Sequence, residues 1–440
     1  MNIYALSSGR GPSGIAIIRI SGKETLKICE KITKLKSIKS NEVNFCKFYN
    51  PKNDNVIDPE ALLLWFPGPN SYTGEDLAEL QIHGSNAVIN ALFKVLSEEE
   101  NCRLAEPGEF TKLAFQNDKI DLLKAESIGD LIAAETELQR KQALRIMTGD
   151  SSKKFNFWRE ELIKILADIE AKIDFPDEDI PENLYVNIKN KCEKIMKEIK
   201  ATLDDNKAGE IIREGFKIAI IGPPNVGKSS LLNYLSKREV AIVSEKAGTT
   251  RDVIEIYLDL EGIPIIISDT AGIRDSKDEI EKKGIKLSLK KAENADLKLV
   301  VVDAKSIDLS GFLNDLLKKD AILVINKSDL LKEKLDPEVS KFNHVLISLK
   351  DNLNIDKLIS KIKNHLENKF ISEEDILITR ERHRQHLLQC VEHLKNFSDK
   401  NDKKDFDKGA EDLRLATRQL GMIVGKVDVE EILGSIFNDF

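Results

Sequence analysis

The spacing of hydrophobic residues changes three times along the chain and divides it into four blocks. From residue 1 to about 117, short apolar runs such as GIAIIRI, ALLLWF and LAELQIH alternate with segments rich in Gly and Pro. Short apolar runs bounded by turn-forming residues are typical of strands. This first block therefore predicts an α+β domain over residues 1–117.

Residues 118–214 and 372–440 share a helical pattern. Apolar residues recur at intervals of three and four in IDLLKAESIGDLIAAETELQRKQALRIM and WREELIKILADIEAKID, which indicates amphipathic helices. The last block, which includes DILITRERHRQHLLQCVEHL, has the same spacing. The simplest interpretation is one all-α helical domain built from these two flanking segments.

Residues 215–371 have a third pattern, in which strand-like runs alternate with polar helical stretches. The runs are FKIAII, IPIIIS, LKLVVVDA, AILVIN and HVLIS, and such alternation is typical of a mostly parallel sheet with crossover helices. An α/β domain is therefore predicted as an insertion, which needs only two neighbouring chain ends at a surface loop. The predicted fold class is multidomain, with an α+β domain, a split all-α domain and an inserted α/β domain.

Composition and charge limit the classes of function. The 440 residues are 41% hydrophobic and carry a net charge of −8, which argues against binding nucleic acid through bulk positive charge. The five Cys are scattered without a C-x-x-C pair, as expected in a reducing compartment. The sequence begins without a signal-peptide pattern and contains no run of eighteen apolar residues. We therefore expect a cytoplasmic protein that does not enter a membrane.

The segment GPPNVGKS, residues 222–229, matches the phosphate-binding pattern G-x-x-x-x-G-K-[ST]. It follows the strand FKIAII and precedes a helix, which is the context that the pattern requires. Gly222 and Gly227 let the backbone approach phosphate closely. Lys228 is expected to reach the outer phosphates, and the Ser229 hydroxyl to hold Mg²⁺. A chance glycine-rich turn is the alternative, which the flanking strand and helix disfavour.

The segment NKSD, Asn326–Asp329, identifies the base. It ends the strand AILVIN, at the sheet edge where such folds bind ligands. The Asp329 carboxylate can accept two hydrogen bonds from guanine, whereas adenine lacks that pair of donors. Asn326 is placed for the other edge of the ring, and the Lys327 stem for its face. An isolated NKSD is a common surface loop, so its meaning depends on the other boxes.

Two further boxes complete the pattern of a GTPase. DTAG (269–272) supplies an Asp for Mg²⁺ and a Gly N–H for the γ-phosphate, and GTTRD (248–252) contains Thr250, a candidate to close on Mg²⁺. Four boxes in this order predict an inserted Ras-like P-loop GTPase domain. ISLK (347–350) fills the fifth position, where a Ser-Ala pair is usual, and Leu349 departs from that pattern.

The sequence resembles the MnmE (TrmE) family of tRNA-modification GTPases nearly end to end. The similar blocks are IAIIRISG, PNSYTGEDLAELQIHG, AEPGEFTKLAF, NDKIDLLKAE, GPPNVGKSSLLN, AIVSEKAGTTRD and LRLATRQLG. Outside the nucleotide boxes it is their joint order that carries the resemblance. The GTP-binding residues expected from the boxes and the resemblance are Asn225, Val226, Gly227, Lys228, Ser229, Ser230, Ser244, Glu245, Lys246, Ala247, Gly248, Thr249, Thr250, Asp269, Thr270, Ala271, Gly272, Asn326, Lys327, Ser328 and Asp329.

The resemblance also implies how GTP is hydrolysed. Ile273 stands where other GTPases often have a Gln that orients water. In the family, K⁺ and dimerisation of the G domains activate hydrolysis, and the family's catalytic Glu matches Glu281. Taken alone, Glu281 lies on an ordinary charged helix face. The family's potassium ligands match Asn225, Ser244, Lys246 and Thr249.

For the N-terminal domain, the resemblance implies dimerisation and a folate site. The family binds 5-formyl- or methylene-tetrahydrofolate as a one-carbon donor, and the matching residues are Arg19, Glu79 and Lys119. Arg and Lys suit the glutamate tail of a folate, and a carboxylate suits the donor edge of the pterin. Taken alone, each of the three is an ordinary surface charge.

The implied function is GTP hydrolysis coupled to tRNA modification. In the family, a homodimer forms a heterotetramer with the flavoprotein MnmG (GidA), and the complex adds a carboxymethylaminomethyl or aminomethyl group to carbon 5 of the wobble uridine. The alternative is a ribosome-assembly-type switch GTPase, which shares the nucleotide boxes. No RNA-binding module with a GXXG loop follows the G domain, which disfavours it. Members of the family usually end in a Cys-Ile-Gly-Lys tail, and EILGSIFNDF is the segment that precedes the position of that tail. We expect GTP hydrolysis not to depend on the tail.

One further cluster suggests a metal site, with two alternatives. His383, His386, Cys390 and His393 lie along one predicted helical face. One helix offers about two ligands to one ion, so a second element would have to supply the rest. Helix packing or solvated side chains are the stronger interpretation.

Overall fold

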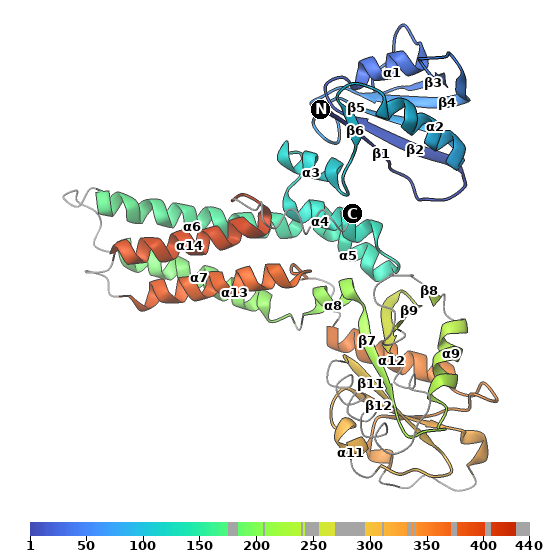
Figure 1. Ribbon diagram of the computed structural model, residues 1–440. Helices are drawn as coiled ribbons and strands as arrows, with labels where there is room; N and C mark the ends of the chain where they lie inside the picture. The colour runs from blue at the N-terminus through green and yellow to red at the C-terminus, as the bar shows by residue number, and fades with distance from the viewer. Residues whose placement is uncertain are drawn as a thin grey trace, which may run out of the picture. The chain divides into compact units, whose positions relative to one another are not determined.

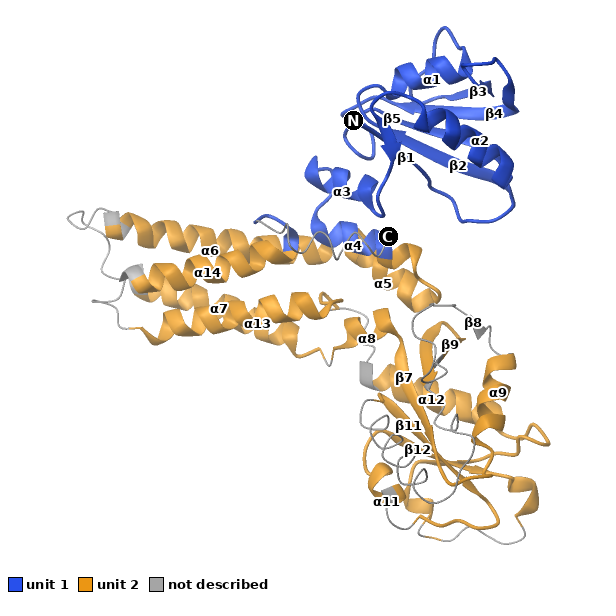
Figure 2. Cartoon of the chain, viewed as in Figure 1, with its two compact units in different colours: residues 1–129, 424–440 blue, residues 130–423 orange. Residues whose placement is uncertain are grey.

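The computed structural model describes residues 1–174, 184–205, 207–238, 241–242, 255–268, 295–309, 312–331, 337, 339–370, 376–400 and 406–427. The chain divides into two compact units, unit 1 with residues 1–129 and 424–440 and unit 2 with residues 130–423 (Figure 2). This division keeps the helical part and the inserted domain together. The domain boundaries predicted after residues 117, 214 and 371 therefore remain predictions.

Unit 1 contains a six-stranded sheet with the strand order β3-β4-β5-β2-β1-β6. β1 and β6 pair in parallel, and the other neighbouring strands pair antiparallel. The elements are β1 (Asn2–Leu6), β2 (Ser13–Ser21), α1 (Thr25–Thr33), β3 (Val43–Tyr49), β4 (Val56–Phe66), β5 (Leu77–Gly84), α2 (Asn86–Ser97), β6 (Cys102–Leu104), α3 (Glu109–Gln116) and α4 (Leu122–Ile132), which runs across the boundary into unit 2.

The alternation of side chains gives this sheet one covered face. In β4, Ala61, Leu63 and Trp65 are buried, and they share one core cluster with apolar residues of α1 and α2. The intervening residues Leu62 and Leu64 point to the opposite face. The first block is therefore an α+β domain in which both helices cover the same face (Figure 1).

The helical part of unit 2 contains long helices that lie side by side (Figure 1). They are α6 (Asp150–Asp174), α7 (Leu184–Leu203), α13 (Glu381–Asp399) and α14 (Phe406–Val424). Buried residues recur every three or four positions, so each helix presents an apolar stripe to its neighbours; in α6 they are Phe155, Trp158, Leu162, Ile165 and Ile169. Two of these helices precede the inserted sheet in sequence and two follow it.

The helical pattern of residues 120–147 is interrupted between two helices. α4 ends at Ile132, and α5 (Glu137–Met147) begins after Thr136. The Gln139 N–H donates to Thr136 Oγ1 at 3.4 Å, and Thr136 N donates to Gln139 Oε1 at 3.2 Å. This is a capping box, which fixes the start of a helix. The periodicity indicated helix here without locating the break.

The inserted domain contains a seven-stranded sheet with the order β13-β12-β11-β7-β10-β9-β8 among its described residues. The pairs from β13 to β10 are parallel, and β10–β9 and β9–β8 are antiparallel. The elements are α8 (Ala208–Glu214), β7 (Phe216–Ile221), α9 (Lys228–Arg238), β8 (Ala241–Ile242), β9 (Glu255–Leu260), β10 (Ile263–Ser268), β11 (Leu297–Asp303), α11 (Phe312–Leu316), β12 (Ala321–Asn326), η1 (Ser328–Leu330), η2 (Val339–Lys341), β13 (His344–Leu346) and α12 (Ile355–Phe370).

The central strands of this sheet are buried on both faces. In β7, Ile218 and Ile220 belong to a core cluster with α8, α9 and α12, whereas Ala219 and Ile221 belong to a second cluster with α11. Burial on both faces explains why FKIAII is continuously apolar instead of alternating. The predicted multidomain fold class is confirmed.

Arg384 of α13 ties the segment that enters the inserted domain to the segment that leaves it. Its guanidinium donates to Glu210 Oε1 and Asp205 Oδ1, both at 2.6 Å, and to the Leu203 carbonyl at 2.9 Å. Burial alone would lower the pKa of the Arg384 guanidinium, but its hydrogen bonds with Glu210 and Asp205 outweigh burial and raise that pKa. The Arg384 guanidinium therefore remains charged.

Asp130 forms a second tie between the same two segments. Its Oδ1 accepts a hydrogen bond from Arg213 Nε of α8 and another from Arg380 Nη2, just before α13, both at 2.8 Å. Gly209 of α8 also packs closely here, because a Cβ at that position would lie 1.9 Å from the Ile378 carbonyl oxygen. The segment that enters the inserted domain and the segment that leaves it are thus held together by hydrogen bonds between charged groups and by close packing.

Within the described ranges, the helices are either too short or too polar to cross a lipid bilayer.

Candidate functional site

The predicted phosphate loop lies between β7 and α9. A Cβ at Gly222 would lie 2.1 Å from a backbone oxygen of β11, and a Cβ at Gly227, whose φ is 103°, would lie 2.3 Å from Asn326 Nδ2. Glycine is therefore required at both positions. Lys228 Nζ donates to the carbonyls of Gly222 and Pro223 at 2.8 and 2.7 Å. The ammonium group consequently lies within the curve of the loop.

Ser229 and Ser230 follow Lys228 in the first turn of α9 and are exposed. The backbone N–H groups of a first helical turn lack partners within the helix and point out of its N-terminus. Such an end attracts anions, phosphate above all. The loop and this helix end together have the arrangement expected of a phosphate cradle, with two hydroxyls at its edge.

Two hydrogen bonds join the NKSD segment to the phosphate loop. Asn326, 3% exposed, donates through Nδ2 to the Val226 carbonyl at 2.8 Å. Lys327 Nζ donates to the Asn225 carbonyl at 3.0 Å. Because β11 separates β7 from β12 in the sheet, these contacts bridge segments from two non-adjacent strands. Asn225 has a φ of 62°, a left-handed conformation that Asn adopts more readily than most residues.

The segment in the fifth position orients Asp329. The Ser348 hydroxyl donates to Asp329 Oδ1 at 2.7 Å, and the Leu349 backbone N–H donates to Asn326 Oδ1 at 3.4 Å. A backbone N–H is present whatever the side chain, so the departure at Leu349 does not remove the contact. The structure therefore places ISLK beside the residues predicted to bind the base.

Asp303 was not found by sequence reasoning, although it contacts this group. Its Oδ2 accepts a hydrogen bond from Lys327 Nζ at 2.7 Å, and this bond holds the pKa of the Asp303 carboxyl below its usual value. Asp303 ends β11 directly opposite Asn326 in the parallel register. The available signal was a polar residue at the end of an apolar strand, on the edge that carries the other boxes.

Arg19 and Glu79 lie opposite each other in the sheet of unit 1. Arg19 of β2 pairs with Glu79 of β5 in the antiparallel register, and its Nη2 and Nε donate to Glu79 Oε1 at 2.6 and 3.1 Å. The two side chains remain 25% and 20% exposed. A guanidinium has five N–H donors, so the pair leaves Arg19 with donors for a ligand carboxylate.

Two aromatic rings and Lys119 lie around this pair. The Arg19 guanidinium is 5.3 Å from the ring centroid of Tyr72 and 5.6 Å from that of Phe110. A Cβ on Gly74 would lie 3.0 Å from Lys119 Cε, so the Lys119 stem runs along the loop that carries Tyr72. The three predicted folate residues therefore share one region of unit 1. Tyr72, in a loop, and Phe110, in α3, were not predicted, because they reach Arg19 through tertiary packing.

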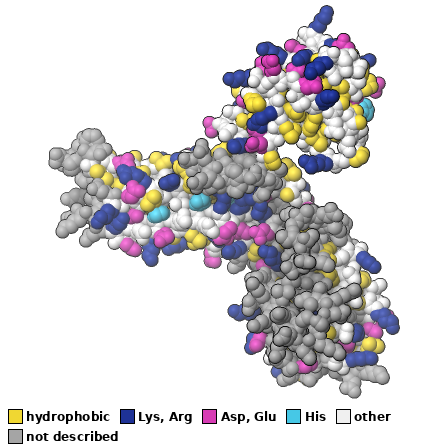
Figure 3. Space-filling model, in the orientation of Figure 1, with side chains coloured by type: hydrophobic (Ala, Val, Ile, Leu, Met, Phe, Trp, Pro, Cys, Tyr) yellow, Lys and Arg dark blue, Asp and Glu magenta, His cyan; other side chains and the backbone are white. Residues whose placement is uncertain are grey.

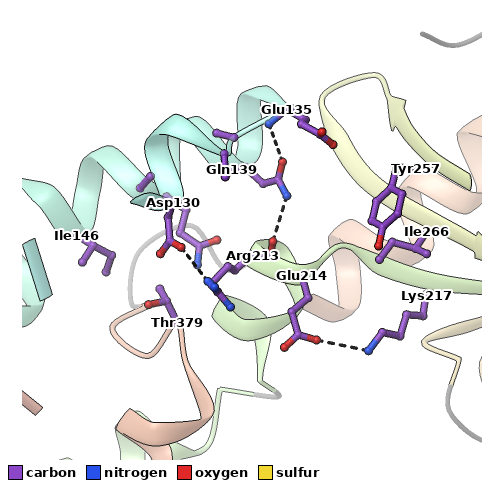
Figure 4. Close-up of a pocket in the computed structure, with 14 residues that line it drawn as sticks. Asp130, Glu135, Gln139, Ile146, Arg213, Glu214, Lys217, Tyr257, Ile266 and Thr379 are labelled. Atoms are coloured by element: carbon purple, nitrogen blue, oxygen red, sulfur yellow. Dashed lines mark hydrogen bonds and ion pairs between the residues drawn. The ribbon is translucent and has the colours of Figure 1, made fainter. Parts of the chain in front are cut away.

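A separate cavity of about 470 Å³ lies in unit 2 between α5, α8 and the inserted sheet (Figure 4). On one wall, Gln139 Nε2 donates to the Arg213 carbonyl at 3.2 Å, and Arg213 Nε donates to Asp130 at 2.8 Å. Tyr257 of β9 and Ile266 of β10 line it from the sheet. Among the described residues, none of the predicted nucleotide or folate residues lines this cavity.

Comparison with known proteins identifies the family. Family models described as "GTP-binding protein TrmE N-terminus" and "MnmE helical domain" match residues 2–119 and 122–440. The tRNA modification GTPase MnmE of Pelagibacter ubique (strain HTCC1062) is 65% identical over 440 residues, which cover all of this chain and 99% of that protein. The chain belongs to the MnmE family.

A second relative and one solved structure complete the comparison. The tRNA modification GTPase MnmE of Rickettsia bellii (strain RML369-C) is 43% identical over 442 residues, which cover all of this chain and 98% of that protein. The G domain of the T. maritima FeoB iron transporter is 28% identical, covers 34% of this chain and 98% of its own, and has a TM-score of 0.28. That TM-score is too low to support an inference about this MnmE family member.

Several residues predicted from the nucleotide boxes or implied by the MnmE resemblance lie outside the described residues. They are the catalytic candidate Glu281, and the nucleotide and potassium candidates Ser244, Glu245, Lys246, Ala247, Gly248, Thr249, Thr250, Asp269, Thr270, Ala271 and Gly272. Their roles remain predictions.

The His and Cys residues of α13 were a candidate metal site in this MnmE family member. Among the described residues, no group of three or more His, Cys, Asp or Glu side chains is arranged to hold a metal ion. His386 Nδ1 is 2.7 Å from Gln419 Oε1, and His383 and Cys390 are buried in the helix interface. Burial raises the pKa of the Cys390 thiol, which disfavours the thiolate that metals bind. Helix packing, the stronger alternative, agrees with this arrangement.

Proposed function

We propose that this chain is a K⁺-dependent GTP hydrolase of tRNA modification. With the flavoprotein MnmG (GidA), it drives addition of a carboxymethylaminomethyl or aminomethyl group to carbon 5 of the wobble uridine, using a tetrahydrofolate one-carbon donor. Membership of the MnmE family supports the reaction. The observation that carries the GTPase proposal is the pair of hydrogen bonds from Asn326 and Lys327 to the phosphate loop, because they join a phosphate cradle to a guanine-reading carboxylate.

The residues around the phosphate loop fit Mg²⁺ and K⁺. Both are hard cations that take oxygen ligands, and Ser229 and Asn225 each offer an exposed side-chain oxygen at the edge of the loop. Ser229, with Thr250, would hold Mg²⁺; Asn225, with Ser244, Lys246 and Thr249, would hold K⁺. Bound there, the cations offset the negative charge of the transferring phosphoryl group. Glu281 is proposed to orient the attacking water.

The potassium proposal predicts that GTP turnover is about 100-fold faster in KCl than in NaCl, the scale of one preorganised electrostatic contact. Asn225→Ala is expected to abolish that difference, because the side-chain oxygen ligand is lost. Turnover is measured by phosphate release at equal ionic strength. Asn233→Ala, which removes an exposed Asn from α9, serves as the control and should keep the full salt effect. Equal wild-type rates in both salts would rule out the potassium role.

The unit 1 residues fit a folate. Arg19 and Lys119 supply positive charge for the glutamate tail, and Glu79 supplies acceptors for the donor edge of a pterin. Tyr72 and Phe110, beside Arg19, offer flat faces to a ring. These observations support a tetrahydrofolate site around the Arg19–Glu79 ion pair.

The folate proposal predicts binding of 5-formyltetrahydrofolate, detected by titration calorimetry. Arg19→Ala is expected to weaken binding by about 10- to 100-fold, since a charged hydrogen bond contributes about 1.5–3 kcal/mol. Arg10→Ala, which removes an exposed Arg of the same unit, should bind as the wild type does. Absence of binding heat with the wild-type chain would contradict the site, and it is the result that the ribosome-assembly-type switch GTPase predicts.

An exposed apolar surface of unit 1 supports the proposed homodimer. Val43 and Phe45 on the edge strand β3 are 61% and 69% exposed, and they pair with Leu64 and Leu62 of β4, on the face away from α1 and α2. Figure 3 shows hydrophobic side chains exposed on unit 1, with Lys and Arg around them. Such a surface is typical of a protein interface. A cytoplasmic location and tRNA as partner complete the proposal.

A further inference from the structure

The Lys327 ammonium group forms two hydrogen bonds with residues outside the NKSD segment. Its Nζ donates to Asp303 Oδ2 at 2.7 Å and to the Asn225 carbonyl at 3.0 Å. The carboxylate is itself fixed, because Asp303 Oδ1 accepts a hydrogen bond from Lys305 N at 2.9 Å. The Asp303 and Lys327 side chains are 18% and 36% exposed. The pair is therefore partly shielded from water, unlike the exposed pairs that contribute little.

The position of Lys327 makes this restraint relevant to binding. Lys327 lies between Asn326, which donates to the phosphate loop, and the η1 helix that contains Asp329. A free lysine stem carries about 2 kcal/mol of rotamer entropy, which a ligand must overcome if the stem has to be ordered on binding. An ion pair that orders the stem beforehand removes part of that penalty.

The Asp303 carboxylate, unlike the residues of the predicted boxes, is connected to the nucleotide site indirectly. Among the described residues, the carboxylate contacts Lys327 Nζ and the backbone N–H of Lys305, so it reaches the nucleotide residues through Lys327. Any effect of Asp303 on the nucleotide is thus expected to pass through the ammonium group. The same ammonium fixes the carbonyl of Asn225, whose side chain is the candidate K⁺ ligand.

We propose that Asp303 is a positioning residue for guanine-nucleotide binding. It holds the Lys327 ammonium group so that the lysine stem is ordered beside the base site and the Asn225 carbonyl is fixed before the ligand arrives. This inference rests on the proposed function, because Lys327 and Asn225 are nucleotide residues only in that proposal. Asp303 itself contacts neither the base nor the phosphates.

Asp303→Asn separates this role from a local structural one. The amide keeps an oxygen for the Lys305 N–H but loses the negative charge that binds Lys327. We expect the variant to bind GDP about 10- to 100-fold more weakly, the range for loss of a charged hydrogen bond, with an unchanged melting temperature. Binding is measured by fluorescence titration of labelled GDP in NaCl. Wild-type affinity in Asp303→Asn would overturn the proposal, since the turn at Lys305 would then be the carboxylate's whole role.

Two further variants make the test specific. Asp315→Asn removes an exposed ion pair with Lys318 in the same domain and should leave GDP affinity unchanged; an equal loss there would assign the effect to net charge and overturn the proposal. The double variant Asp303→Asn/Lys327→Ala should bind GDP as weakly as Lys327→Ala alone, because Asp303 acts through Lys327. Losses that simply add would contradict this.

The design also separates this inference from the proposed function. GDP affinity is measured in NaCl, so it does not depend on potassium activation. A wild-type chain that binds GDP without stimulation by K⁺ would overturn the potassium proposal and leave the Asp303 comparison intact. A wild-type chain that does not bind GDP would overturn both. Asp303→Asn is further expected to raise the K⁺ concentration for half-maximal turnover, because the Asn225 carbonyl loses its fixed donor.

Discussion

An Asp329→Asn chain is expected to bind GDP about 10²- to 10⁴-fold more weakly than the wild type and to bind xanthosine diphosphate in its place. Guanine offers two N–H donors to the Asp329 carboxylate, and two charged hydrogen bonds together contribute about 3–6 kcal/mol. An amide can accept from only one of these donors and turns its own N–H₂ toward the other. Xanthine has a carbonyl where guanine has its amino group, so its edge matches the donor and acceptor of the substituted amide.

Competition titration of GDP and xanthosine diphosphate measures this change of base preference. The Ser348 hydroxyl holds Asp329 Oδ1 at 2.7 Å, so the substituted side chain should remain aimed at the base. Asp351→Asn is the matched control, because its side chain is exposed and it contacts Ser348 only through its backbone N–H. An Asp329→Asn chain that still prefers GDP would show that this carboxylate does not read the base.

Replacing Arg384 with Ala is expected to lower the free energy of unfolding of the helical part by about 3–5 kcal/mol, the range for removing one partner of a buried ion pair. The Arg384 side chain is 7% exposed, and those of Asp205 and Glu210 are 12% and 9% exposed. Without the guanidinium, two shielded carboxylates face each other. The Leu203 carbonyl also loses its donor.

Guanidinium chloride unfolding followed by tryptophan fluorescence tests this prediction. The chain has two Trp, and in a Trp65→Phe background the remaining Trp158, buried in α6, reports on the four-helix region alone. Arg414→Ala removes a solvent-exposed Arg that pairs with Glu170 and Glu411 and should leave the transition almost unchanged. If the two variants behaved alike, Arg384 would not be the residue that ties these segments.

The elements that could be predicted from the sequence are those whose burial is encoded in one stretch of chain. FKIAII and AILVIN are continuously apolar because both faces of their strands are covered. Each of these runs therefore predicted a strand. β9 and β8 were not predicted, because apolar residues alternate with polar ones in EIYLDL and because β8, at the sheet edge, has only two residues. The break between α4 and α5 depends on the hydrogen bonds of Thr136 and Gln139, which hydrophobic periodicity does not record.

The candidate site was predictable where a role is fixed by local spacing. Lys228 and Asp329 belong to short sequence motifs whose neighbouring residues are predicted to contact the same nucleotide, so a local pattern identifies them. Asp303 and Tyr72 have no such box. Asp303 meets Lys327 because β11 and β12 are in register, and Tyr72 meets Arg19 because a loop folds over the sheet. Contacts of that kind come from tertiary packing, and a single sequence does not reveal them.

The ties at the base of the inserted domain have a consequence for how this chain can be rebuilt. Arg384, Asp130 and Arg380 join the entering and leaving segments, and none of them belongs to the nucleotide-binding sheet. These ties lie outside the sheet, although α8, which carries their partners Glu210 and Arg213, also packs against it. We expect that a shorter linker or a different domain placed after α8 would leave these hydrogen bonds between the two segments in place.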